Sequence, residues 1–215
     1  MFMTGHSVRA GMTSPEASLS DFVVTVTYQD IPECARENIR HAFFDTVGVT
    51  LAGALDDAGT AVFDINGVDS SSTSAPMILG SESNRSPSDR ALHTGTVSHA
   101  LDYDDLAWAI DGNPSVTLVP PLLVLAEEAG ASGEDLMTAF AAGFEIECAL
   151  ADPTSPDHYE DGWHATATFG ALGATAAAAS LLDLSAAEAR HALNVAASTP
   201  AGLKRNFGSS HSMPD

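Results

Sequence analysis

The sequence predicts an all-α fold built from many helices. Apolar residues recur at a period near 3.6 over long stretches, most clearly between residues 35 and 49. Serine and proline start signals precede several of these stretches. Alternation of apolar and polar residues, the mark of a half-buried strand, does not persist beyond about four or five positions. A doubly wound α/β fold is therefore excluded, because its strands are missing.

The expected helices follow one another along the chain. They span residues 19–28, 32–55, 57–68, 90–101, 121–129, 132–151, 165–182 and 185–198. The second has Pro32 in its first turn, where a missing N–H is harmless. The third ends at Gly67, and a Ser/Thr-rich loop at 69–75 and a short extended piece at 76–79 follow it.

The later helices carry clearer start signals. Ser86-Pro-Ser-Asp89 supplies a cap, a first-turn proline and an acid for the fourth. Ser132 caps the sixth, and Ser185 opens a capping box for the last. The helix at 165–182 has no charge and approaches the length of a membrane span. Its Ala, Gly and Thr residues favour tight burial among other helices over insertion into lipid.

Acidic residues dominate the charge of this chain. Its 29 Asp and Glu against 8 Lys and Arg give a formal net charge of −21. Such a charge repels nucleic acid and anionic membranes, so neither is expected as a partner. With 215 residues and 45% hydrophobic content, the chain can bury a full core.

The ends and the cysteines give few further constraints. Residues 1–15 lack the apolar run of a signal peptide, so we expect a flexible tail ahead of a domain at 16–215, and a cytoplasmic location. Cys34 and Cys148 lie far apart and fit neither a disulfide framework nor a metal cluster. Both are expected to be buried thiols.

The composition is also typical of a protein adapted to salt. Lys204 is the single lysine beside seven arginines, and small Ala and Val dominate the apolar set. At molar ionic strength the Debye length falls to about 3 Å, which screens the self-repulsion of an acidic chain. We therefore hypothesise a cytoplasm rich in salt; an acidic protein from an ordinary cell is the alternative.

Added KCl should accordingly raise the midpoint of thermal unfolding. KCl is a suitable probe because, unlike sulfate, it acts mainly by screening charge and little by exclusion from the protein surface. Melting curves recorded over a KCl series test this. A midpoint that does not rise with KCl would contradict the salt hypothesis.

The densest group of chemistry-bearing residues lies at 99–115. His99-Ala-Leu-Asp-Tyr-Asp-Asp105 places an imidazole and three carboxylates at the expected end of helix 90–101, and Asn113-Pro-Ser115 follows. Because the three acids repel one another, one raised pKa is expected. His99 stands three residues before Asp102, on the same helical face, where it can be a cationic neighbour. A solvated helix end with harmless charge is the plain alternative.

These residues resemble the active-site segment of the MmgE/PrpD family, which includes 2-methylcitrate dehydratase and cis-aconitate decarboxylase. The likeness runs over residues 22–208, with landmarks at 44–53, 169–179 and 202–208. It implies an all-α helical domain, forming a homodimer, without the smaller α+β lid domain of family enzymes. A truncated relative, a domain fragment and one product of an interrupted gene all remain open.

The resemblance also implies a site for a small carboxylic acid. His164, in Gly162-Trp-His-Ala-Thr166, matches a family active-site histidine, and Asp102 matches the site aspartate. These two are the expected catalytic residues, although a structural histidine at a helix start is the plain alternative for His164. The expected substrate-binding residues are His99, Asp105, Asn113, Ser115 and Lys204. Neither a metal nor another cofactor is expected.

Three departures from the family pattern bear on activity. Asn113 stands where family enzymes have a histidine, and an amide cannot titrate. Leu106 replaces a polar residue, and Ser212 falls where the active-site lysine belongs. Lys204 and Arg205 are the nearest cations, so a polyanionic substrate would meet repulsion unless a partner chain supplied more positive charge.

The sequence is compatible with two classes of function. The leading one is a lyase acting on small di- or tricarboxylic acids, as in the dehydration of 2-methylcitrate. Decarboxylation of cis-aconitate and epimerisation of an amino-dicarboxylate are not separated from it. The alternative is a catalytically degenerate helical scaffold, or one half of a split enzyme whose lid domain is a separate chain.

Overall fold

The computed structural model describes residues 14–65 and 85–206. Its helices are α1 Pro15–Thr25, α2 Glu33–Gly53, α3 Asp57–Ile65, α4 Pro87–His99, α5 Ser115–Ala129, α6 Gly133–Ala151, α7 Asp157–Glu160, α8 Ala165–Leu181 and α9 Ala186–Ala196, with short 3₁₀ turns η2 Tyr28–Asp30 and η3 Lys204–Asn206. Two isolated bridges, Ala107 with Gly112 and Trp163 with Leu203, are the β-type pairings within these ranges. The all-α prediction is confirmed.

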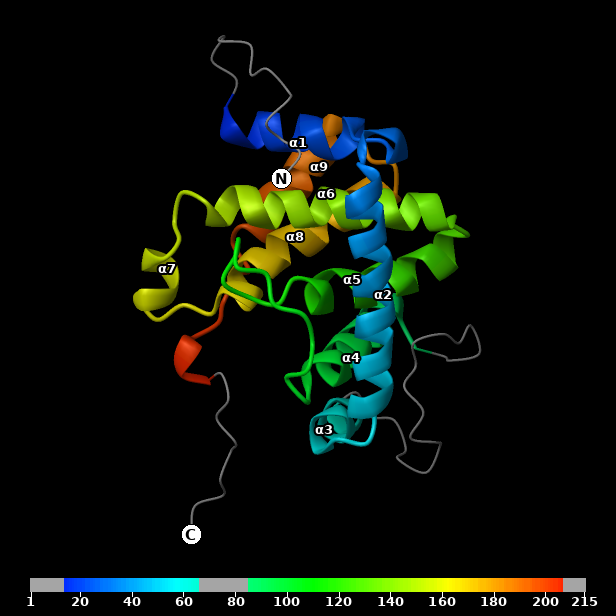
Figure 1. Ribbon diagram of the computed structural model, residues 1–215, viewed down its shortest axis with the longest axis vertical. Helices are drawn as coiled ribbons and strands as arrows, with labels where there is room; N and C mark the ends of the chain where they lie inside the picture. Colours follow the sequence, from blue (N-terminus) through cyan, green and yellow to red (C-terminus); the bar gives the residue numbers. More distant parts are fainter. Residues whose placement is uncertain (1–13, 66–84, 207–215) are drawn as a thin grey trace.

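Helices α6 and α8 pair at the centre of the fold. Their contact is the most extensive between any two described elements, and α1 and α9 pack together on one side of this pair. On the other side lie α5, α4 and α3, and α2 runs across these layers to reach α3 (Figure 1). The segment between α4 and α5 is held against the start of α8, where the backbone N–H of Asn113 donates to Thr166 Oγ1.

Glycine allows the central pair to approach closely. A Cβ added at Gly143 of α6 would lie 2.8 Å from the carbonyl oxygen of Gly173 in α8 and 2.7 Å from the Leu118 side chain. The uncharged run predicted at 165–182 is thus a helix packed on other helices. Within the described ranges, no helix combines the length and apolar character that crossing a bilayer requires.

The predicted start signals of three helices are confirmed. Ser86 accepts a hydrogen bond from the backbone N–H of Asp89 at the start of α4. Ser132 with Asp135, and Ser185 with Glu188, form reciprocal capping boxes at the starts of α6 and α9. Each cap satisfies backbone donors that the first turn of a helix leaves unpaired.

Several helix boundaries were predicted wrongly, most of all the start of α5. Helix α5 begins at Ser115, well before residue 121, and Pro120 and Pro121 lie inside it. Each proline removes one backbone hydrogen bond, but α5 is packed between α4 and α8, and burial outweighs the local loss. Helix α1 spans Pro15–Thr25, where residues 19–28 were predicted.

The two cysteines have opposite environments. Cys148 is buried, as predicted, and burial raises the pKa of its thiol to about 12. Cys34 is exposed, which corrects the prediction of a buried thiol. It sits in the first turn of α2, next to Ala35, which takes the core-facing position.

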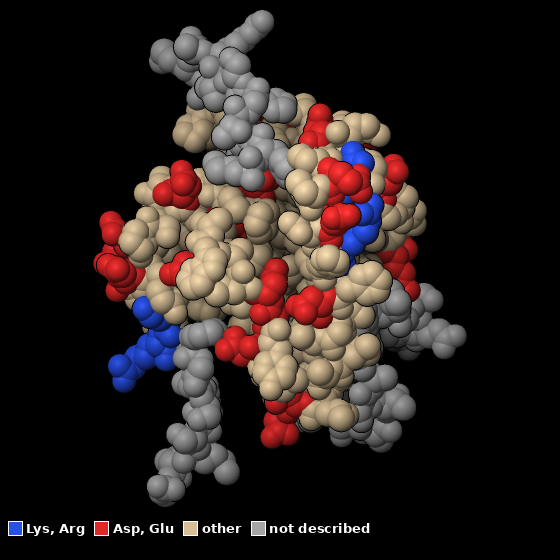
Figure 2. Space-filling view, in the orientation of Figure 1, with Lys and Arg blue, Asp and Glu red and all other residues tan. Residues whose placement is uncertain are grey.

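Acidic side chains are spread over the face shown in Figure 2, whereas basic ones form small, separate patches. One cation is nevertheless in the core: Arg90 of α4 is 2% exposed and forms ion pairs with Glu127 and Glu128 of α5. The pairs join α4 to α5. The predicted tail up to residue 13, the loop at 69–75, the extended piece at 76–79 and Ser212 lie outside the described residues.

Candidate functional site

A hydrogen bond between His99 and Asp104 organises the candidate site. Helix α4 ends at His99, two residues earlier than predicted, and the chain turns through Asp102 at a φ of 53°. The turn returns Asp104 to the histidine, with both carboxylate oxygens 2.9 Å from Nδ1. The predicted shared helical face of His99 and Asp102 is therefore wrong, because Asp102 lies beyond the helix.

The carboxylates favour the charged form of His99. Its pKa is raised, first by the hydrogen bond to Asp104 and then by the charges of Asp104 and Asp102, while burial acts in the opposite direction. The C-terminal end of α4 is itself a favourable place for a cation. His99 is thus biased toward an imidazolium.

His164 has the opposite bias. It caps the N-terminus of α8, and its backbone N–H donates to the carbonyl of Gly202 at 2.9 Å. Its ring centroid lies 6.4 Å from that of His99. Burial lowers its pKa, repulsion from His99 adds to this, and Asp102 acts against it. The site therefore joins a histidine that favours the charged form to one that favours the neutral form.

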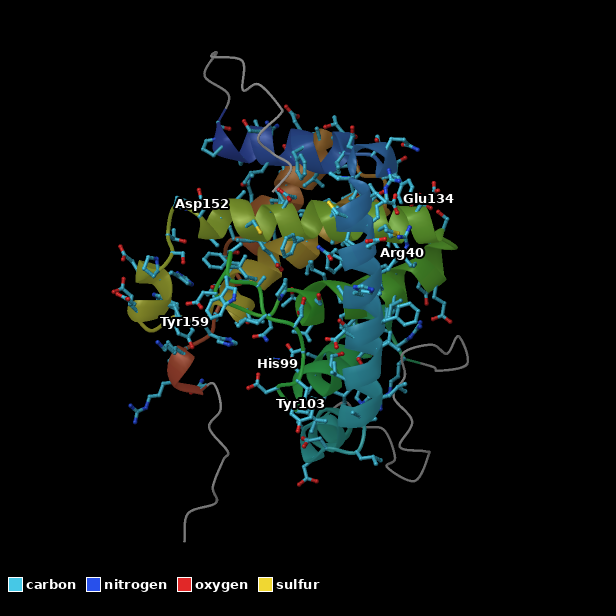
Figure 3. All side chains as sticks on the ribbon, viewed as in Figure 1. Arg40, His99, Tyr103, Glu134, Asp152 and Tyr159 are labelled. Atoms are coloured by element: carbon cyan, nitrogen blue, oxygen red, sulfur yellow. The ribbon has the colours of Figure 1, made fainter. Side chains whose placement is uncertain are left out.

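Both histidines line one pocket of about 570 Å³ between α4, α5 and α8. The other lining residues are mostly small or apolar; they are Ala91, Leu92, Gly95, Thr96, Ala100, Val116, Thr117, Pro121, Thr166 and Ala167. Figure 3 shows His99 and Tyr103 near the end of α4, below the central helices. A pocket of this volume is in the range that small organic ligands occupy.

Asp105, Asn113 and Ser115 form a latch that holds the segment between α4 and α5. The Asp105 carboxylate accepts from the backbone N–H of Ser115 at 3.1 Å and from its hydroxyl at 2.6 Å. Asn113 donates through Nδ2 to the Asp105 carbonyl, and its backbone N–H donates to Thr166 Oγ1 of α8. The latch gives these residues a positioning role, and their binding of substrate stays a prediction.

One of the three clustered acids does have a raised pKa, as predicted. It is Asp105, and burial is the largest cause, with the charges of Asp104 and Asp45 adding to it against the hydrogen bonds from Ser115. Repulsion between the acids is thus the smaller part of the effect.

Lys204 lies at the edge of the described chain, in η3. Its ammonium sits 3.7 Å from the centroid of the Tyr159 ring, and its backbone N–H donates to Gly162. Tyr159 can be found beside this segment in Figure 3. Stacking on an aromatic ring gives the cation a defined place, and its contact with substrate stays a prediction.

One cluster has the geometry to hold a cation. Ligand atoms of His99, Asp102 and Asp104 all lie within 4.8 Å of one another. The His99 to Asp104 hydrogen bond satisfies two of these groups without an ion, and Asp102 is exposed to solvent, so the cluster by itself does not point to a metal. Sequence reasoning missed how closely Asp104 and His99 pair, because their contact depends on the left-handed turn at Asp102.

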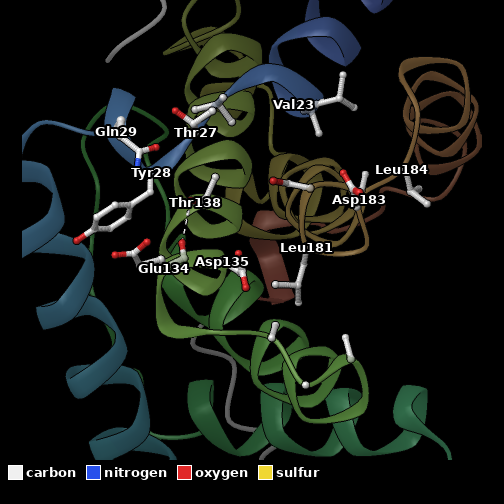
Figure 4. Close-up of a pocket in the computed structure, with 17 residues that line it drawn as sticks. Val23, Thr27, Tyr28, Gln29, Glu134, Asp135, Thr138, Leu181, Asp183 and Leu184 are labelled. Atoms are coloured by element: carbon white, nitrogen blue, oxygen red, sulfur yellow. Dashed lines mark hydrogen bonds between the residues drawn. The ribbon is translucent and has the colours of Figure 1, made fainter.

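A second cavity of about 580 Å³ lies near the ends of α1, α6 and α8 (Figure 4). Glu134, Asp135 and Asp183 are among its lining residues, and neither histidine of the site is. The close-up shows Thr138 bonded back to the carbonyl of Glu134 within α6. This cavity is separate from the candidate site.

The fold and site together define an all-α domain with a histidine and carboxylate site at the junction of α4, α5 and α8. The chain belongs to the MmgE/PrpD family, since the model of the MmgE/PrpD N-terminal domain matches residues 17–214. It is 28% identical to the cis-aconitate decarboxylase of Homo sapiens over 164 residues, which cover 74% of this chain and 34% of that protein. For the cis-aconitate decarboxylase of Mus musculus the identity is 29%, over 74% and 33%. The chain spans about a third of the length of these curated relatives.

Replacing Asp104 with Asn should lower the pKa of His99, because the variant loses both the charge and the carboxylate acceptor. The pKa of His164 should rise, since a less charged His99 repels its proton less. Asp102→Asn is the matched comparison and should lower the pKa of His99 by less, because Asp102 acts through charge alone. NMR titration of the imidazole C–H signals measures all three. Equal shifts in the two variants would contradict the assigned pairing.

Proposed function

We propose that this chain supplies the proton-transfer groups of a lyase that acts on a small di- or tricarboxylic acid. The proposal rests on the histidine pair, whose rings lie 6.4 Å apart at one pocket and whose pKa values are shifted in opposite directions. A charged imidazole can donate a proton and a neutral one can accept it. Pairs of groups whose environments separate their pKa values are a mark of acid and base catalysis.

The chemistry follows from these protonation states. In a dehydration, His164 would take a proton from carbon, and the hydroxyl group would leave as water with a proton from His99. In a decarboxylation, carbon dioxide would leave, its bonding electron pair would stay on carbon, and an imidazolium would protonate that carbon. His99 engages Asp104 through Nδ1, so its exchange with substrate would use Nε2.

The substrate class is supported by the family and by the names of the two relatives. Both are cis-aconitate decarboxylases, so cis-aconitate is the first substrate to test, and 2-methylcitrate is the second. A tricarboxylate needs more positive charge than one imidazolium provides. We therefore infer that further cations reach the pocket from another chain or segment, and a homodimer or a separate lid chain would provide them.

A non-catalytic scaffold remains the second candidate, because Asn113 has hydrogen bonds that serve the latch and cannot titrate. The two candidates differ in whether the pocket binds the acid at all. A scaffold predicts no response of the histidines to a carboxylic acid.

The test is an NMR titration of the wild-type chain in KCl with cis-aconitate and then with 2-methylcitrate. Binding should shift the imidazole signals of His99 and His164 and raise both pKa values, because an anion favours the charged ring. KCl at equal ionic strength is the control for screening, and exposed His191 of α9 is the internal reference. New product signals would show turnover as well. Unmoved site histidines with both acids would contradict the proposal.

A further inference from the structure

Glu147 is a buried carboxyl group that the proposed chemistry does not use. It lies on α6, is fully buried and is in contact with α5 and α8. A Cβ added at Gly173 of α8 would overlap Cγ and Oε1 of Glu147 and lie 2.7 Å from Cδ, so the group is pressed against the backbone of α8. Among the described residues, Oε2 has no hydrogen-bond partner.

The contact between Glu147 and Thr117 indicates whether the carboxyl group carries a proton. Thr117 Oγ1 lies 2.8 Å from Glu147 Oε1 and 2.7 Å from the carbonyl oxygen of Pro114. A hydroxyl group has one proton, and a carbonyl oxygen can only accept. If Glu147 were ionised, both neighbours of the hydroxyl would be acceptors, and one of these two short oxygen pairs would have no proton between them.

We propose that Glu147 is held as a neutral carboxylic acid that donates a hydrogen bond to Thr117. Thr117 in turn donates to the carbonyl of Pro114, and Glu147 thereby positions the start of α5. In this relay Oε1–H of Glu147 donates to Thr117 Oγ1, and the Thr117 hydroxyl donates to the Pro114 carbonyl. Both short contacts then have a proton. Pro114 caps α5, and its carbonyl also accepts from the backbone N–H groups of Thr117 and Leu118.

The electrostatic environment of Glu147 also favours the neutral acid. Burial raises the pKa of Glu147 well above its usual value, the charge of Asp105 adds to this, and the hydrogen bond with Thr117 acts in the opposite direction. Helix α8 contributes no charged residue along Ala165–Leu181, and the charged residues of α5, Glu127 and Glu128, pair with Arg90. On α6 itself, neighbouring Cys148 has a raised pKa and so stays a neutral thiol.

The relay and the latch act on the same turn from two sides. Asp105 accepts both hydrogen bonds from Ser115, which suits an ionised carboxylate, whereas the neutral acid of Glu147 donates toward Pro114. Thr117 also lines the pocket that holds both histidines. Glu147 is thus a positioning residue that acts through Thr117, and the inference does not depend on the reaction catalysed.

Infrared difference spectroscopy tests the protonation state directly. The spectrum of wild type minus Glu147→Gln, recorded near neutral pH, should contain the carbonyl stretch of a protonated carboxyl group. Gln keeps the shape and can donate to Thr117 through its amide. Glu134→Gln, an exposed position on the same helix, is the matched control and should lack this band. Carboxylate bands in place of the carbonyl stretch would overturn the proposal.

Thr117→Val provides a second test that keeps the acid in place. The variant removes the acceptor of the Glu147 proton, so the carbonyl stretch should move to higher frequency. A band that stays where it was would overturn the relay. Both spectra are recorded without substrate, so they can fail while the titration with cis-aconitate succeeds, and the reverse.

The pH dependence of unfolding is an independent test of the protonation state of Glu147. Because the pKa of Glu147 is raised in the folded protein, folding takes up a proton once the pH exceeds the usual value of 4.5. Wild-type stability therefore falls as pH rises from there toward the folded pKa, and Glu147→Gln has no such loss. The difference between the thermal midpoints of the variant and of wild type should therefore increase, in favour of the variant, as the pH rises above 4.5. A constant difference would contradict the neutral acid.

Discussion

Gly53→Ala should destabilise the protein by about 1–3 kcal/mol, the range expected for overpacking a tight contact. Gly53 is buried at the end of α2, where this helix crosses α4. An added Cβ would overlap the carbonyl oxygen of Val97 and lie 3.2 Å from its carbon. The obstacle is the backbone of a neighbouring helix, so a change of side-chain rotamer cannot relieve it. Urea unfolding of wild type and variant measures the change.

Gly48→Ala is the matched control in the same helix. A Cβ at Gly48 would meet no atom of the described residues within 4 Å, and Gly48 is exposed. Alanine there should stabilise the protein by roughly 0.5–1 kcal/mol, because it restricts the unfolded chain and favours helix. If glycine-to-alanine substitutions at these two positions of α2 change stability in opposite directions, the packing effect at Gly53 is distinguished from the helix propensity of alanine. A neutral Gly53→Ala would mean that α2 and α4 can move apart at little cost.

The parts of the fold that could be predicted are those governed by local chemistry. Ser86, Ser132 and Ser185 identified their helix starts because a cap and its partner lie within four residues. The uncharged composition of 165–182 likewise indicated a buried helix. Such signals need no knowledge of the rest of the chain.

What could not be predicted depends on tertiary contact. The fifth helix was predicted to begin at residue 121, but packing of α5 against α4 and α8 keeps Pro120 and Pro121 inside a helix that begins at Ser115. Asp102 was placed on the helical face of His99, whereas its positive φ ends the helix and returns Asp104 to the histidine. The family resemblance predicted His99 and His164 as site residues, which stays a prediction, whereas their opposite pKa shifts depend on tertiary geometry.

His164→Ala should reduce turnover of the proposed substrate by about 10²–10⁴-fold, the range for loss of a general acid or base. The fold should persist, because the contacts of His164 that begin α8 come from its backbone. His191→Ala, at an exposed position of α9, is the control and should leave turnover unchanged. Product formation followed by NMR measures both variants, and unchanged turnover in His164→Ala would remove its role as a base.

The pH profile sharpens this test, because a purely structural loss would not alter its shape. The pKa of His164 is lowered, so wild-type turnover should fall only when the pH drops below the usual histidine value near 6.5. The pKa of His99 is raised, so turnover should fall on the alkaline side when the pH passes above that value. The acid limb should disappear in His164→Ala, while the alkaline limb stays. Retention of both limbs would assign the base to another residue, and loss of both would indicate that the two rings titrate as one unit.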